Sequence, residues 1–243
     1  MGNKVNPIGA RIGFTKGWNS SWFCNEGCYS KKISSDIVIK NFIKKKLGGI
    51  VLTNIYIERV LNNITIYIEC PDPGVVIGKN GENIKSLSDA LKKTFNEDFS
   101  VNILESKNKP LNAKIIVSSI VEKINSRIPY KKAIKQNMET AMSARAEGIK
   151  VIISGRLGGA EIAREECFSL GKISNHTLKS DIDYCFGTAE TVYGTIGIKV
   201  WVSKGEVVLN NMPLMSIKKI AENKPKNFKN YDFKNNKNFK KAN

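Results

Sequence analysis

The most regular alternation of apolar and polar residues lies within the first third of the chain. Apolar side chains at Ile64, Ile66, Ile68 and Cys70 alternate with Thr65, Tyr67 and Glu69. This period of two predicts a strand with one buried face. Residues 54–60 are also strand-like, and Asn62 and Asn63 predict a hairpin turn between the two strands, because Asn tolerates positive φ. Residues 100–105 predict a third strand.

Helical periods flank these strands. Between residues 33 and 47, apolar residues alternate with lysines in a way that predicts a basic amphipathic helix, ended by Gly48 and Gly49. A short apolar run at 75–77 breaks into a loop, after which an apolar stripe to Phe95 predicts another helix. The predicted order over residues 33–105 is therefore helix, strand, strand, short helix, loop, helix, strand.

The second half of the chain begins after residues 107–110, which look like a linker. An apolar stripe predicts a helix that stops before Pro129, and a second helix runs from Tyr130 to Ala146 with Gly148 at its C-cap. A strand at 150–154 and a glycine-rich turn follow. The stretch to Ser203 is expected to alternate between strand-like and helical segments, with a strand at 198–202.

Two compact α+β domains fit this pattern better than one doubly wound sheet. We predict an α+β protein with an N-terminal arm (1–32), a first domain (33–106), a linker (107–110), a second α+β domain (111–209) and a basic flexible tail (210–243). From residue 217 onward the tail is too rich in Lys and Asn to bury a core. It is either a solubilising tail or, as we favour, an arm that orders on nucleic acid.

Charge narrows the choice of partner. Lys and Arg number 39 against 22 for Asp and Glu, so the formal net charge is +17. Nucleic acid is the expected anion, and a membrane surface is the weaker alternative. No apolar run approaches the roughly 20 residues that span a bilayer, and no signal segment is recognisable, so we expect a cytosolic protein without a membrane partner.

Residues that could carry metal or catalytic chemistry are few. Cys24 and Cys28 have the spacing of half a zinc site, but no second close Cys or His pair follows, so we expect two ordinary thiols. His176 has no recognisable nucleophile partner, and Asp181 and Asp183 are expected to cap or salt-bridge. We therefore predict no enzyme, no cofactor, no metal and no small-molecule substrate.

The loop Gly78-Lys79-Asn80-Gly81 is the most informative motif. Gly74 and Gly78 are too close together for a nucleotide-binding Walker loop, and Asn80 follows Lys79 where a Ser or Thr would hold Mg²⁺. The loop also supplies only the second half of a dinucleotide-binding pattern. A plain glycine turn remains the structural alternative. Because glycines let a sugar-phosphate strand lie against the backbone, and because Lys79, Lys85 and a helix N-terminus add positive charge, the segment resembles a type II KH domain, whose loop clamps about four nucleotides.

Longer motifs place this domain in a wider resemblance. Residues 2–13, 18–23, 148–164, 181–184 and 193–201 are similar in order and spacing to the family of small-subunit ribosomal protein number three. The resemblance implies a structural protein of the small-subunit head that binds small-subunit rRNA and neighbouring head proteins, in the cytoplasm or in an organelle that encodes it. It also implies that the protein lines the mRNA entry channel and assists passive unwinding of mRNA through Lys131, Lys132 and Lys135.

Those three lysines stand out independently, because positive charge in the first turns of a helix opposes the helix dipole. The remaining RNA-binding candidates are Lys4, Arg11, Arg156 and Arg164, and surface salt bridges are the alternative for the last two. A free-standing KH-domain protein of RNA processing or transcription is the rival function. An enzyme that uses nucleotides is the contrasting class.

Overall fold

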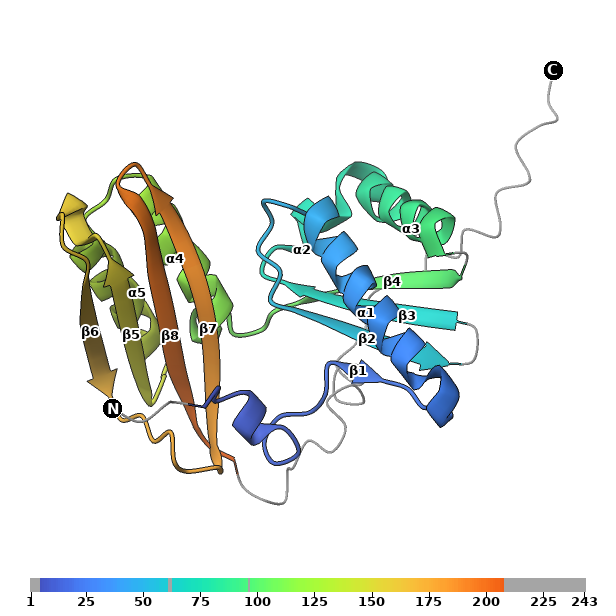
Figure 1. The fold of residues 1–243 in the computed structure, drawn as a ribbon, viewed down its shortest axis with the longest axis horizontal. Coiled ribbons are helices and arrows are strands. Elements are labelled where there is room, and N and C mark those ends of the chain that lie inside the picture. Colours follow the sequence, from blue (N-terminus) through green and yellow to red (C-terminus); the bar gives the residue numbers. More distant parts are fainter. Residues whose placement is uncertain (1–4, 61–62, 96, 208–243) are drawn as a thin grey trace, which may run out of the picture.

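The computed structural model describes residues 5–60, 63–95 and 97–207 (Figure 1). It contains two α+β domains, and each has a four-stranded sheet with helices packed on one face. This arrangement confirms the predicted fold class. The predicted tail (210–243) and Lys4 lie outside the described residues.

The first domain follows the predicted order. Its elements are α1 (Glu26–Lys46), β2 (Asn54–Val60), β3 (Asn63–Cys70), α2 (Pro73–Ile77), α3 (Glu82–Phe95) and β4 (Asp98–Glu105). Strand β3 pairs antiparallel with β2 and parallel with β4. Ile39 and Ile43 of α1 and Leu91 of α3 are fully buried against Ile66 and Ile68 of β3. Each such side chain contributes about 1.5–3 kcal/mol, so this shared core fixes the helices over the sheet.

The N-terminal part of this domain differs from the prediction in two ways. Helix α1 begins at Glu26 rather than near residue 33, so the predicted arm contains the first turns of the helix, including Cys28. The arm also supplies a short strand, β1 (Ser20–Ser21), which pairs parallel with β2. The predicted hairpin turn falls partly on residues 61–62, which lie outside the described part, and Asn63 begins β3.

The second domain places two helices on one face of an antiparallel sheet. Its elements are α4 (Ala113–Asn125), α5 (Tyr130–Ser143), β5 (Gly148–Gly155), β6 (Arg164–Gly171), β7 (Ser180–Thr191) and β8 (Gly194–Glu206). The strand order is β6-β5-β8-β7. Ile120 of α4 and Ile134 of α5 are fully buried against Ile149 and Ile153 of β5 and Val200 of β8.

Two predictions for the second domain are wrong. All of residues 160–203 are described, and none of them is helical; β6, β7 and most of β8 occupy this stretch. Gly148 is not a helix cap but begins β5, where a Cβ would collide with the backbone of Lys172. Helix α5 ends at Ser143 with Ala144 as its C-cap, and Arg145, with φ of 67°, takes the left-handed position that a glycine usually fills.

Polar side chains join the two domains. Lys114 of α4 reaches into the first domain, where its Nζ donates to the carbonyl of Thr53 and, at 3.3 Å, to Asn54 Oδ1. Asp183 of β7 accepts the N–H of Ala113 at 3.0 Å and pairs with Lys16 of the arm at 3.5 Å. The arm and the start of α4 therefore both carry polar contacts that connect the domains.

Candidate nucleic-acid interface

The glycine loop lies between α2 and α3, as predicted, and forms one turn of 3₁₀ helix at Lys79–Gly81. Gly78 has φ of 72° and ψ of −179°, a region that is essentially restricted to glycine. A Cβ there would also collide with the side chain of Asn83. Gly81 has φ of 75° and open space around it. The two glycines therefore determine the backbone path, and Gly81 leaves its side of the loop uncovered.

The charges around this loop are mixed. Lys79 is exposed at its outer side, and Lys85 is exposed in the first turns of α3. The N-terminus of α3 adds partial positive charge from its backbone N–H groups, whereas Glu82 in the first turn opposes it. The predicted residues Gly78, Lys79, Asn80 and Gly81 are thus brought together at one helix start, with Lys85 close by in the sequence. The arrangement can hold a phosphate chain against the backbone.

A second basic surface covers the start of α5. Lys131, Lys132 and Lys135 are exposed there, while Ile134 and Met138 of the same helix are buried. Among the described residues, no carboxylate lies within ion-pair distance of Lys131 or Lys132, and Lys135 lies 3.9 Å from the exposed Glu139. These lysines therefore present nearly uncompensated positive charge to solvent, in agreement with their predicted place beside the apolar stripe.

Tyr130 connects this lysine cluster to β6. Its ring centroid lies 6.0 Å from Lys131 Nζ, and its hydroxyl donates to the carboxylate of Glu166 at 3.1 Å. Arg164 pairs with Glu166 at 3.1 Å and donates to the Tyr130 hydroxyl at 3.4 Å. Arg164 therefore forms a surface salt bridge, which was the alternative to RNA binding. Its side chain is nevertheless 54% exposed.

Arg156 makes backbone contacts rather than a salt bridge. Its Nε donates to the carbonyl of Ala160 at 2.9 Å, and its Nη1 donates to the carbonyl of Tyr193 at 3.1 Å. The guanidinium also lies 5.8 Å from the centroid of the Tyr193 ring. Arg156 therefore holds the glycine turn against the β7–β8 hairpin.

Arg11 has a structural position that its sequence motif did not reveal. The side chain is buried, and its Nε donates to the carbonyl of Ser180 at 2.7 Å. Its terminal nitrogens donate to the carbonyls of Pro7, Asn175 and Thr177 at 3.0–3.1 Å. Because the guanidinium is enclosed by backbone oxygens, we leave Arg11 out of the RNA interface.

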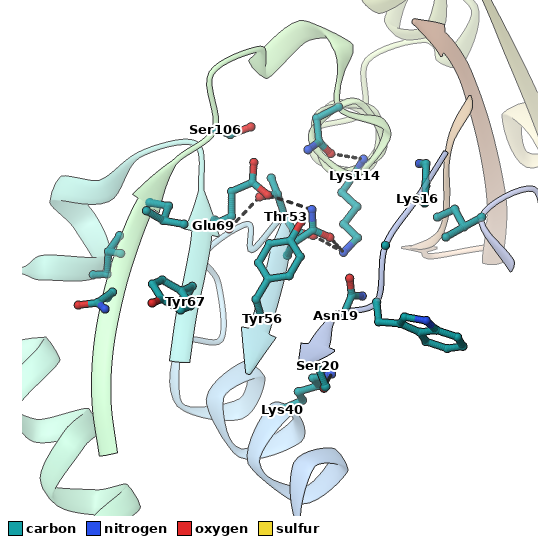
Figure 2. A pocket seen from close by; sticks show the side chains of 18 of the residues that line it. Lys16, Asn19, Ser20, Lys40, Thr53, Tyr56, Tyr67, Glu69, Ser106 and Lys114 are labelled. Carbon is teal, nitrogen blue, oxygen red and sulfur yellow. Dashed lines mark hydrogen bonds between the residues drawn. The ribbon is translucent and has the colours of Figure 1, made fainter. Parts of the chain in front are cut away.

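A groove between the domains is a feature that sequence reasoning missed. Figure 2 shows Lys16, Lys40, Lys114 and Tyr56 among the side chains that line it. Burial lowers the pKa of Lys114 below its usual value. Burial, with a smaller effect of Glu69 and Asp183, raises the pKa of Tyr56 to about 12. The residues that line the groove come from segments as far apart in the sequence as Lys16 and Asp183, so no local sequence pattern marks the groove.

The described ranges hold neither a candidate metal site nor a candidate membrane span. There, no three His, Cys, Asp or Glu side chains lie close enough to share a metal ion. No helix in those ranges has the length and apolar content needed to cross a membrane.

Asp183 caps and salt-bridges, as predicted: its carboxylate accepts the first N–H of α4.

The fold and the glycine loop define a KH-domain protein. A KH domain model matches residues 38–111, and a model described as "Ribosomal protein S3, C-terminal domain" matches residues 120–202. With the relatives described below, these matches show that the chain belongs to the family of small ribosomal subunit protein uS3. The resemblance seen in the sequence motifs is therefore confirmed.

The similar proteins are bacterial. Small ribosomal subunit protein uS3 of Desulforamulus reducens is 42% identical over 208 residues, which are 86% of this chain and 94% of that protein. The protein of the same name from Flavobacterium psychrophilum is 44% identical over 85% of this chain and 81% of its own length. That of Nitrosococcus oceani is 40% identical over 85% and 93%. Membership of this non-enzymatic family confirms the prediction that the chain is not an enzyme.

Proposed function

We propose that the chain is a structural constituent of the small-subunit head in cytoplasmic ribosomes, where it binds rRNA and neighbouring proteins. In this proposal Lys131, Lys132 and Lys135 face the mRNA entry channel. The exposed lysine cluster at the start of α5 is the observation that carries it. Family membership supports the ribosomal location.

The lysine cluster is suited to holding single-stranded RNA. Each Lys near the start of α5 costs about 0.3–1 kcal/mol against the helix dipole, and no acidic residue occupies that first turn. Helix stability alone does not explain such a choice, whereas contact with a polyanion does. Lysines that attract unpaired strands assist unwinding passively, because they stabilise the open form of a hairpin whenever it opens thermally.

The glycine loop is the second proposed RNA contact. Gly81 leaves the backbone open to a sugar-phosphate strand, and Lys79 adds an exposed charge beside it. Asn80 and Lys85 belong to the same surface. Arg156 and Arg164 add positive charge near the glycine turn of the second domain, in addition to the contacts that each makes within the chain. Lys4 remains a proposed contact in the arm.

Triple replacement of Lys131, Lys132 and Lys135 by Ala tests the channel role. Ribosomes with this variant should translate unstructured messages normally and should slow on messages that contain stable hairpins. The matched control replaces Lys172, Lys179 and Lys199, which are also exposed on the second domain but lie outside α5. Equal translation of both kinds of message by the α5 variant would contradict the proposal.

Sedimentation separates the proposal from a free-standing KH-domain protein. A ribosomal protein should sediment with small subunits at physiological salt and stay there when mRNA is removed. A protein that acts alone on RNA should instead sediment with its transcripts and be released by ribonuclease. Recovery only in the second form would sink the ribosomal assignment.

A further inference from the structure

Helix α1 has an unexpected second apolar face. Its inner face carries Ile39 and Ile43, which are fully buried in the first core. A second face carries apolar residues at intervals of four, namely Tyr29, Ile33 and Ile37. All three are exposed. A helix that is apolar on two faces is normally covered on both.

This outer face forms one wall of the groove between the domains. We call its end lined by Trp18, Trp22, Tyr29, Ile33, Ile37 and Lys40 the aromatic groove. Trp18 is 70% exposed, and Tyr29 is 54% exposed. The Trp22 ring lies 5.4 Å from the Tyr29 ring, and its Nε1 donates to Asp36 at 2.8 Å. Trp22 is therefore fixed in place, while Trp18 and Tyr29 present open ring surface.

The aromatic groove is positively charged. The carboxylate of Asp36, beside these residues, is neutralised by Arg59, whose Nη2 lies 2.6 Å from Asp36 Oδ1. Lys40 donates to the hydroxyl of Ser20 at 3.1 Å, as Figure 2 shows at the end of the arm. Exposed lysines continue along α1 on both sides, at Lys31, Lys44 and Lys45. An occupant must therefore be anionic and offer flat apolar surface to the rings.

We propose that the aromatic groove binds a single-stranded stretch of RNA, whose bases stack on Trp18 and Tyr29 while a phosphate lies near Lys40. Rings set in a basic groove are the usual platform for unpaired bases. The cores of protein interfaces, by contrast, are depleted in Lys, so the lysines that border these rings favour RNA over a protein partner. This contact is separate from both the glycine loop and the α5 lysines.

The test uses the full chain and a fluorescein-labelled oligouridine of about 12 nucleotides, a length within the usual site sizes. Trp18→Ala and Tyr29→Ala should each weaken binding about 5- to 150-fold. They should leave the salt dependence unchanged, because stacking releases no counterions. Lys40→Gln should instead flatten the salt slope by roughly 0.7. Phe186→Ala is the matched control, since that ring is 53% exposed on the second domain.

The same series is repeated with Lys131, Lys132 and Lys135 replaced by Ala, so that loss of the α5 contact and loss of this one are read separately. Irradiation of a 5-iodouridine version of the probe should crosslink Trp18 or Tyr29. Unchanged affinity of both aromatic variants, or crosslinks elsewhere only, would overturn the proposal. If Trp18→Ala spares RNA binding but reduces incorporation into reconstituted subunits, the face belongs to a protein neighbour and the RNA assignment is wrong.

Discussion

At Gly78 the backbone takes φ of 72° and ψ of −179°, which a residue with a Cβ reaches only under strain. We expect Gly78→Ala to destabilise the first domain by about 1–3 kcal/mol and to weaken RNA binding, because the loop path changes. Urea unfolding followed by circular dichroism measures the first effect.

Gly74 gives the matched control. It lies in α2, has no positive φ, and a Cβ there would meet nothing within 4 Å. Gly74→Ala should therefore be neutral or stabilise by about 0.4–1 kcal/mol, because it restricts the unfolded chain. Equal losses in the two variants would show that the backbone conformation of Gly78 is not what matters.

The side chain of Arg11 stabilises the fold through several backbone carbonyls that it contacts at the same time. Arg11→Ala removes the side-chain donor from the carbonyls of Pro7, Asn175 and Ser180, and each buried carbonyl left unpaired costs about 1–3 kcal/mol. We expect a total loss of about 4 kcal/mol, at the upper end of single substitutions. Thermal unfolding measures it, and Arg11→Lys should recover only part, since one ammonium cannot reach all of these oxygens. Full recovery by Lys would contradict the network.

The sequence marked Arg11 as basic but could not show its partners. The carbonyls that it contacts are backbone groups, so they leave no trace in residue identity, and Ser180 is 169 residues away. Asp183 was easier to interpret, since a carboxylate near lysines predicts a cap or a salt bridge. The sequence thus predicted the kind of contact that Asp183 makes, whereas it did not predict that Arg11 is buried.

Helix α5 carries its lysines at the end where they weaken it. Lys131→Glu should therefore raise the melting temperature of the second domain by a few degrees, reflecting about 0.3–1 kcal/mol, while it weakens binding of single-stranded RNA. Calorimetry and fluorescence anisotropy measure the two effects. Lys93→Glu, in the last turn of α3, is the mirror control and should lower stability instead. Opposite signs in the two helices would confirm that the dipole is responsible.

Elements with a single buried face were predictable from their periodicity. Strand β3 and helix α4 are of this kind, and both lie where the pattern placed them. Strand β6 was not predicted, because it is an edge strand whose two faces are largely exposed. Its sequence therefore lacks the alternation of apolar and polar residues. The predicted start of α1 was wrong because the exposed apolar residues on its outer face obscure the apolar stripe of its buried face. The aromatic groove went unnoticed for the same reason.

The two domains are held together at a junction that depends on pH. Burial raises the pKa of Asp183, but Lys204, Lys16 and the N–H of Ala113 outweigh that effect and hold the pKa below its ordinary value. This carboxylate therefore stabilises the folded chain fully above its unfolded pKa of about 3.9, and the contribution is lost as pH falls through the lower folded value.

We expect the acid limb of the stability curve to depend on Asp183. Asp183→Asn should reduce the free energy of unfolding near neutral pH and should make it less sensitive to pH below about 4. Chemical unfolding at a series of pH values measures this. Asp98→Asn is the control, because that carboxylate is 79% exposed. An acid limb identical in the wild type and the Asp183 variant would rule out this role.

The position of Arg11 also has a consequence for the time course of synthesis. A ribosome adds roughly 5–20 residues per second, so Ser180 is made about 8–34 seconds after Arg11, given the 169 residues between them. During that interval the earliest part of the chain lacks the carbonyls that later enclose its guanidinium. A nascent chain stalled before β7 would leave the arm open to proteases and to the nucleic acids around it. The arm, although it is made before both domains, is thus among the last segments to reach its final place.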